Sequence, residues 1–174
     1  MEFKLAESIR ILERTPSILE SLLSAFPKEW IITNEGPGTW NPFEVIGHLI
    51  EGEKHDWIPR MQIILSDRAD KRFIPFDRYA HLHLHSQRAL NDLIREFDKL
   101  RTQNLLILKS TPIDDNTLNR KGVHPEFGDV TLRQLLATWV THDLAHLTQI
   151  TRVMAKQYRE EIGPWAANFN VFKK

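Results

Sequence analysis

The chain has 174 residues, of which 41% are hydrophobic and 26% charged, as is typical of one globular domain with a continuous core. Its 23 Lys and Arg residues balance 23 Asp and Glu residues, so it lacks the basic character typical of nucleic-acid-binding proteins. The absence of cysteine excludes disulfides, thiolate metal ligands and a cysteine nucleophile. Thiol chemistry would therefore need a thiol brought by a substrate.

The first residues predict neither a secretion signal nor a membrane anchor. Acidic side chains stand at two of the first seven positions, and no apolar run approaches the ~20 residues that cross a bilayer. We therefore expect a cytoplasmic protein without a membrane or nucleic-acid partner.

The first predicted helical region is divided by a proline. Apolar residues at Leu5, Ile9 and Leu12 recur at helical spacing, and Thr15 precedes Pro16. Thr is favoured as an N-cap and Pro in the first helical turn. We therefore expect a break at Pro16, with a new helix starting there.

The next helix has the clearest start signal in the chain. Asn41 can cap it, Pro42 suits the first turn, and Glu44 can reach back to the amide of the cap residue. The apolar pattern extends this helix to about Leu65, with a kink near Pro59.

Two more long helices complete the predicted fold. The third spans Phe76 to about Leu108, and the fourth starts at a second capping box at Thr131 and continues to about Tyr158. Proline and glycine are frequent in the connection between them, and no strand alternation is evident. The pattern predicts an all-α four-helix bundle with long crossover loops, in a single domain over residues 1–174.

The most informative motif is His142-Asp-Leu-Ala-His146 on the last helix. Side chains four residues apart lie on the same helix face, so both imidazoles can reach one point. The pair falls within the apolar stripe of Trp139 and Ile150, where an unpartnered imidazole would cost ~1–3 kcal/mol. The spacing is compatible with two hydrogen-bonded core histidines but favours two ligands of a divalent metal.

A third histidine, His48, lies on the helix that starts at Asn41. The apolar stripe of that helix lies mostly to one side of it, so periodicity alone leaves open whether His48 is a ligand or borders a second buried seam. The absent side chain at Gly52 would leave space for a metal or ligand. Three neutral imidazoles would leave coordination positions open, as in catalytic sites. We expect His55 to be exposed.

The cluster His81-Leu-His83-Leu-His85 does not predict a metal site. When the apolar stripe of the third helix is projected back at 100° per residue, only His83 points inward. We therefore expect His81 and His85 to be exposed and His83 to border the site. His124 lies in a turn with proline and glycine neighbours, where a structural role is expected.

Two better-known metalloenzyme motifs do not fit. His-Asp-x-x-His resembles the His-Glu-x-x-His of zincins, but Asp143 is one methylene shorter and no third ligand follows downstream. A di-iron bundle would need paired Glu-x-x-His motifs, which the chain lacks. Asp143 remains a candidate for orienting a ring or accepting a proton, unless it is simply an exposed helix aspartate.

In three segments the chain resembles the DinB-like (YfiT-like) superfamily of metal-dependent bundles. They are Gly38-Thr-Trp-Asn-Pro-Phe-Glu-Val-Ile-Gly-His-Leu-Ile50, the segment from Thr131 to Arg152, and the segment from Tyr158 to Trp165. Together they show a Trp-x-Pro helix start that leads to one histidine, followed by His-x-x-x-His on the last long helix. The resemblance spans essentially the whole chain.

The resemblance implies a four-helix bundle with one divalent metal ion, often zinc or nickel. His48, His142 and His146 match the three ligands, and Gln149 matches a polar position that can support the site. Characterised relatives include thiol-dependent transferases and a thiol-dependent isomerase. Some relatives of that isomerase use Glu for one last-helix ligand, where this chain has His142, so the ligand set does not single out the isomerase branch.

These observations lead to three functional hypotheses. The first is a metal-dependent S-transferase that uses a low-molecular-weight thiol and a small-molecule substrate. The second is a hydrolase in which metal-bound hydroxide is the nucleophile. The third is a non-catalytic bundle that acts through partners. Exposed apolar helix surface could also pair two copies into a homodimer.

Overall fold

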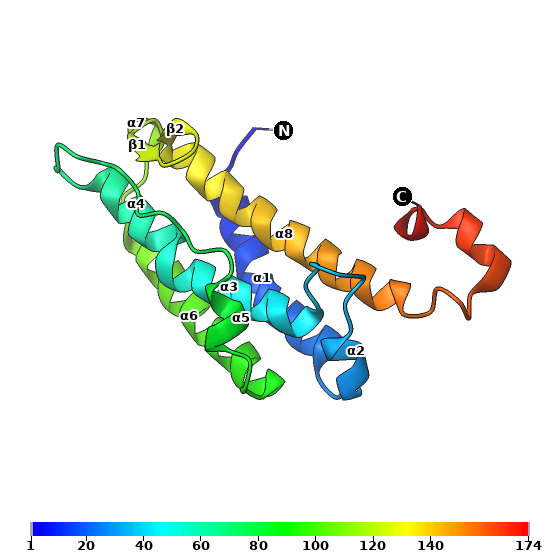
Figure 1. The fold of residues 1–174 in the computed structure, drawn as a ribbon. Helices are drawn as coiled ribbons and strands as arrows, with labels where there is room; N and C mark the ends of the chain where they lie inside the picture. Colours follow the sequence, from blue (N-terminus) through cyan, green and yellow to red (C-terminus); the bar gives the residue numbers. More distant parts are fainter. Residues whose placement is uncertain (1, 174) are drawn as a thin grey trace.

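The computed structural model describes residues 2–173, in which four long helical segments lie side by side (Figure 1). This arrangement confirms the predicted all-α four-helix bundle. The segments are α1 (Leu5–Leu23), α3 (Pro42–His55) continued by α4 (Trp57–Leu65), α6 (Leu90–Ser110) and α8 (Leu132–Lys156). The shorter elements are α2 (Lys28–Ile32), α5 (Ala80–Leu84), α7 (Asp115–Leu118), β1 (Lys121–His124), β2 (Gly128–Thr131), η1 (Gly163–Asn168) and η2 (Asn170–Phe172).

The predicted break at Pro16 is wrong, because α1 continues through this residue. Pro16 has no N–H to donate to the carbonyl of Leu12, four residues earlier. The guanidinium of Arg101 on α6 donates to that carbonyl instead, with an Nη1–O distance of 2.8 Å. A hydrogen bond from a neighbouring helix thus satisfies the carbonyl that the proline leaves free.

Both predicted capping boxes are present. Asn41 accepts from the backbone N–H of Glu44, whose carboxylate accepts from the N–H of Asn41. Thr131 and Gln134 repeat the arrangement at the start of α8. These two caps fix where α3 and α8 begin, and therefore where their histidines lie.

The helix from Asn41 to Leu65 is interrupted at Asp56, three residues before the proline at which a kink was predicted. Pro59 cannot donate to the carbonyl of His55, so the α-helical hydrogen-bond ladder fails just there. The chain re-enters a helix at Trp57, and Figure 1 shows α3 and α4 as two successive helices.

The predicted third helix starts too early. The chain from Phe76 to Tyr79 is not helical, the short α5 follows, and α6 begins only at Leu90. The apolar stripe of α6 is buried as expected at Leu93 and Phe97. Its helical periodicity does not extend to the residues before Leu90, because the helix is interrupted there.

The connection before α8 contains an antiparallel hairpin of β1 and β2, which was not predicted. Its strands are four residues each, too short for a period-two pattern to stand out. Phe73 packs against Gly122, where a Cβ atom would come within 2.4 Å of the Phe73 ring. Backbone hydrogen bonds between Val123 and both Lys71 and Phe73 join the hairpin to the loop after α4.

The apolar core forms two clusters along the bundle. One surrounds Trp139 and Met61, and the other surrounds Ile46, Phe97 and Ile150. Within residues 2–173, no helix combines the length and the apolar character that crossing a bilayer requires.

Candidate metal centre

Three imidazoles from two helices meet at one point, and we call them the histidine cluster: His48 of α3 with His142 and His146 of α8. One ring nitrogen of each lies within 4.8 Å of the others. The Nε2 atom of His142 is 3.1 Å from Nε2 of His48 and 3.1 Å from Nε2 of His146. Two nitrogens bound to one tetrahedral zinc ion would lie ~3.3 Å apart, so this spacing fits a shared metal ion.

Burial keeps these rings neutral. Desolvation, assisted by the neighbouring histidines, lowers the pKa of His48 to about 3 and that of His142 to about 2. Desolvation also lowers the pKa of His146, although Gln149 opposes the shift. Neutral imidazole is the form that binds a metal, so the rings are in the protonation state that a metal site needs.

The Nε2 atoms of the cluster lack protons for all their short contacts. Nδ1 of His146 donates to Oε1 of Gln149 over 2.9 Å, which leaves a lone pair on Nε2. Among residues 2–173, Nδ1 of His48 and Nδ1 of His142 are buried and have no hydrogen-bond partner. A single proton on Nε2 of His142 can serve only one of its two short contacts. A cation at the meeting point would use all three lone pairs.

Two tryptophans enclose the cluster. The ring of Trp40 lies 4.8 Å from His48 and stacks 6.3 Å from His146, as measured between ring centroids. Trp57 contacts His142 edge-on at 5.0 Å and stacks on Trp139. The space expected at Gly52 is therefore not free, because a Cβ there would lie 3.2 Å from the Trp57 indole nitrogen.

Asp143 does not face the histidine cluster, and it is not exposed. Its carboxylate is fully buried and accepts from Nη1 and Nη2 of Arg101 at 2.6 and 3.0 Å, and from the Thr15 hydroxyl at 2.6 Å. Glu53 accepts from Arg101, Asn104 and Trp139. We call these side chains the arginine network: Thr15, Glu53, Arg101, Asn104, Trp139 and Asp143.

The arginine network keeps its central cation charged. Burial acts against the charge of Arg101, but the carboxylates of Asp143 and Glu53 outweigh it and raise the pKa of this guanidinium. Because Asp143 is held by three hydrogen bonds inside the core, it has no free oxygen for a substrate. This geometry argues against a catalytic base at Asp143, whose carboxylate instead joins α8 to α1 and α6.

A pocket of about 460 Å³ opens beside the histidine cluster. All three histidines line it, together with residues of α4, the loop after α4, the hairpin and α8. Sequence reasoning missed several of these lining residues: Asp56, Arg60, Phe73, Phe76, Arg78 and Phe127. They have no common spacing, because the loop and the hairpin bring them together. Burial raises the pKa of Asp56 to about 6 against the pull of Arg60.

The expectations for His81, His83 and His85 are reversed. His81 and His85 are 2% and 3% exposed and pack against Gly47 of α3, whereas His83 is exposed. The prediction extended the helical phase of α6 back to these histidines, but they lie on or next to α5, which is a separate helix. The other two expectations hold: His55 is exposed, and His124 stabilises its turn by accepting from two backbone N–H groups.

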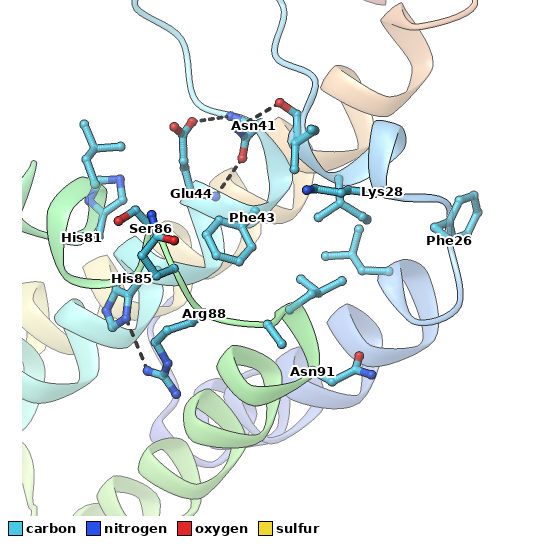
Figure 2. A pocket seen from close by; sticks show the side chains of 18 of the residues that line it. Phe26, Lys28, Asn41, Phe43, Glu44, His81, His85, Ser86, Arg88 and Asn91 are labelled. Atoms are coloured by element: carbon cyan, nitrogen blue, oxygen red, sulfur yellow. Dashed lines mark hydrogen bonds between the residues drawn. The ribbon is translucent and has the colours of Figure 1, made fainter.

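His81 and His85 line a second pocket of about 820 Å³ between α2, α3 and the segment that joins α5 to α6 (Figure 2). Several of its polar groups are already paired, although both ring nitrogens of His81 are buried without a hydrogen-bond partner among residues 2–173. Glu44 is engaged in the α3 cap, and His85 accepts from Arg88 and bonds to Glu51. This pocket presents no converging set of free ligands comparable to the histidine cluster.

Comparison with known proteins agrees with the fold. The DinB superfamily model matches residues 11–150. The chain belongs to the DinB superfamily. Among solved structures, this DinB-superfamily chain is similar to YfiT from Bacillus subtilis, with a TM-score of 0.75, 18% identity and 91% of each chain covered. YfiT is described as a probable metal-dependent hydrolase with an unusual four-helix bundle topology. No curated protein matches the chain.

Proposed function

We propose that this chain is a metal-dependent enzyme that binds one divalent ion through Nε2 of His48, His142 and His146. The observation that carries the proposal is the meeting of three neutral imidazoles. Their Nε2 atoms lie in short contact, and too few of them can carry a proton to make every contact a hydrogen bond. Zinc and nickel are the ions we favour, because imidazole nitrogen suits both. Three protein ligands leave positions open toward the adjacent pocket.

The ion would supply Lewis acidity, which lowers the pKa of a thiol or water bound in the pocket and makes it a nucleophile near neutral pH. The chain supplies orientation and shielding. Gln149 fixes the tautomer of His146, and the two flanking tryptophans pack against the rings of His48 and His142.

For the nucleophile, we favour a low-molecular-weight thiol, in an S-transferase reaction with a small-molecule electrophile. The chain has no cysteine of its own, so the thiol must enter with a substrate. A pocket of about 460 Å³ lies in the size range of small-molecule sites. Hydrolysis is the second candidate, and the description of YfiT as a probable metal-dependent hydrolase favours it.

The first test is elemental analysis of the untagged protein and of variants that lack one histidine. We expect about one divalent ion per chain in the wild type and in His55→Ala, whose exposed ring serves as the matched control. His142→Ala and His146→Ala should lose the ion. At a free metal concentration of 100 times Kd, the wild type should gain ~2.7 kcal/mol of stability on binding. No ion after reconstitution with zinc or nickel would refute the metal site.

The second measurement separates the reactions. The metal-loaded protein is incubated with electrophiles, with and without added thiols, and the products are identified by mass spectrometry. Thioether or thioester products that require the wild-type histidines support the transferase, whereas hydrolysis without thiol supports the second candidate. A metal-loaded protein that turns over neither substrate class would indicate a non-catalytic bundle.

A further inference from the structure

The core of the molecule contains two buried arginines with different surroundings. Arg101, 1% exposed, donates to Asp143, to Glu53 and to a backbone carbonyl of α1. Arg60, 7% exposed, has one polar contact among residues 2–173, an ion pair between its Nη1 and Oδ1 of Asp56 at 2.7 Å. The second arginine is therefore short of acceptors.

A guanidinium carries five N–H donors, and a buried donor without an acceptor is costly. Nε of Arg60 is buried and has no hydrogen-bond partner within residues 2–173. One face of the group lies over the Phe73 ring, 5.2 Å from its centroid. Arg60 also lines the pocket that the histidine cluster lines, so a molecule bound there can accept hydrogen bonds from the part of the guanidinium that faces the pocket.

A second arginine adds positive charge to the same pocket. Arg78 is exposed, lines the pocket from the loop before α5, and has no ion-pair partner among the described residues. Desolvation lowers the pKa of His124 at the hairpin; the charge of Arg60 lowers it further, that of Glu126 raises it, and that of Arg78 lowers it. Of the acidic residues that line the pocket, Asp56 pairs with Arg60, and Glu126 is exposed.

Four large aromatic side chains contribute to the remaining walls of the pocket. Trp57, Phe73, Phe76 and Phe127 line it, and Phe127 is 71% exposed at the hairpin tip, where it stacks on His124. Rings of this kind bury the apolar body of a ligand, while a guanidinium fork binds an oxyanion through two parallel hydrogen bonds. The volume fits a small molecule rather than a macromolecular segment.

From these contacts we infer that the pocket binds a small molecule with an apolar or aromatic body and an oxyanionic group, carboxylate or phosphate. Arg60 is the specificity-determining residue that holds the oxyanion, and Arg78 supports it from the loop. The inference rests on the proposed function only in treating this anion as the substrate of the metal site. The two arginines that would bind the oxyanion do not belong to the histidine cluster, although the three histidines line the same pocket.

The test is calorimetric titration of the protein, at constant ionic strength, with benzoate, phenyl phosphate and the uncharged analogue benzamide. We expect each anion that the site accepts to bind at least about tenfold more tightly than benzamide, because charge-assisted hydrogen bonds to Arg60 are lost in the neutral compound. Benzoate and phenyl phosphate distinguish a carboxylate from a phosphate. Equal binding of all three compounds, or no anion binding, would overturn the inference.

Variants then assign the binding to the arginine. Arg60→Gln should weaken anion binding about tenfold or more, and Arg60→Lys should restore only part of it, because lysine lacks the fork. Arg95→Gln is the control, since it removes the same charge from an exposed position on α6. Should Arg60→Gln fail to fold, the exposed Arg78→Gln gives the second measurement, with an expected weakening of a few-fold.

Metal and anion binding are read separately. His142→Ala removes a proposed metal ligand but neither arginine, so Arg60-dependent anion binding should persist in it. This result would support the anion site even if elemental analysis found no metal in the wild type. If His142→Ala lost all anion binding while Arg60→Gln kept it, the anion would bind at the metal instead, and the inference would be wrong.

Discussion

The arginine network is buried, and the histidine cluster is buried at His48 and half-buried at His142 and His146. Both join α8 to its neighbours, yet their hydrogen bonding differs. In the arginine network, each carboxylate oxygen of Asp143 and Glu53 accepts at least one hydrogen bond, and of the network's side-chain donors only Nε of Arg101 is unpartnered. In the histidine cluster, two Nδ1 atoms are unpartnered and three Nε2 atoms face one another. The first cluster is complete as a piece of core, whereas the second presents three Nε2 lone pairs that a shared metal ion would use.

The difference teaches how to recognise function among buried polar groups. A protein that buries charge for packing surrounds it with acceptors and donors, because each missing partner costs free energy. A protein that buries polar atoms for binding leaves them without partners and beside a cavity. By this criterion Arg60 belongs with the histidines and Arg101 does not.

The largest expected effect comes from breaking the arginine network. Asp143→Ala leaves the buried charge of Arg101 poorly compensated and should lower the free energy of unfolding by ~3–5 kcal/mol. In the metal-free protein, His142→Leu should change it by less than ~1 kcal/mol, or increase it, because an unpartnered nitrogen is removed. Urea denaturation of both variants measures the contrast. Similar losses in the two variants would contradict it.

The next effect concerns pH. In the unfolded chain His142 binds a proton below its ordinary pKa of 6.5, but in the folded, metal-free protein its pKa is about 2. Between these values the unfolded state holds more protons, so stability falls as pH falls, by ~1.4 kcal/mol per pH unit for this residue.

Urea denaturation at pH 6 and pH 4.5 measures this dependence. His142→Leu should show a slope shallower than that of the wild type by about this amount. Asp56, whose pKa burial raises to about 6, acts in the opposite direction in both proteins and cancels in the difference. Parallel slopes would show that His142 does not stay neutral.

The smallest effect comes from the hydrogen bond that orients His146. Gln149→Leu removes the acceptor of Nδ1 and should weaken metal binding about tenfold, as measured by competition with a chelator. Thr148→Ala, an exposed neighbour whose hydroxyl bonds only to the backbone of its own helix, should leave the affinity unchanged. Equal affinities of Gln149→Leu and the wild type would mean that packing alone orients the ring.

Local signals in the sequence predicted the parts of the site that depend on one helix. The capping boxes at Asn41 and Thr131 set the starts of α3 and α8, and the spacing of His142 and His146 placed both rings on one face. For His48, periodicity left the role undecided. Family resemblance assigned it to the cluster, because the contact joins residues 94 positions apart.

The parts that depend on tertiary contacts were not predictable. Asp143 looked like an exposed helix residue because its partner, Arg101, lies on another helix. Arg60 and Arg78 line one pocket only because the hairpin packs against the loop after α4, and this contact joins segments far apart in the sequence. His81 and His85 were misplaced because helical phase was extended across an interruption that no proline or glycine marks.

The hydrogen bond between Arg101 and the Leu12 carbonyl also bears on redesign of this chain. Replacing Pro16 by alanine is a common way to strengthen a helix, and here it would restore an N–H that competes with the guanidinium for the same oxygen. Pro16 therefore leaves one carbonyl of α1 free for Arg101 of α6. The resulting hydrogen bond ties the turn of α1 that contains Leu12 to α6. In a redesigned chain, Pro16 and Arg101 should be kept together or replaced together.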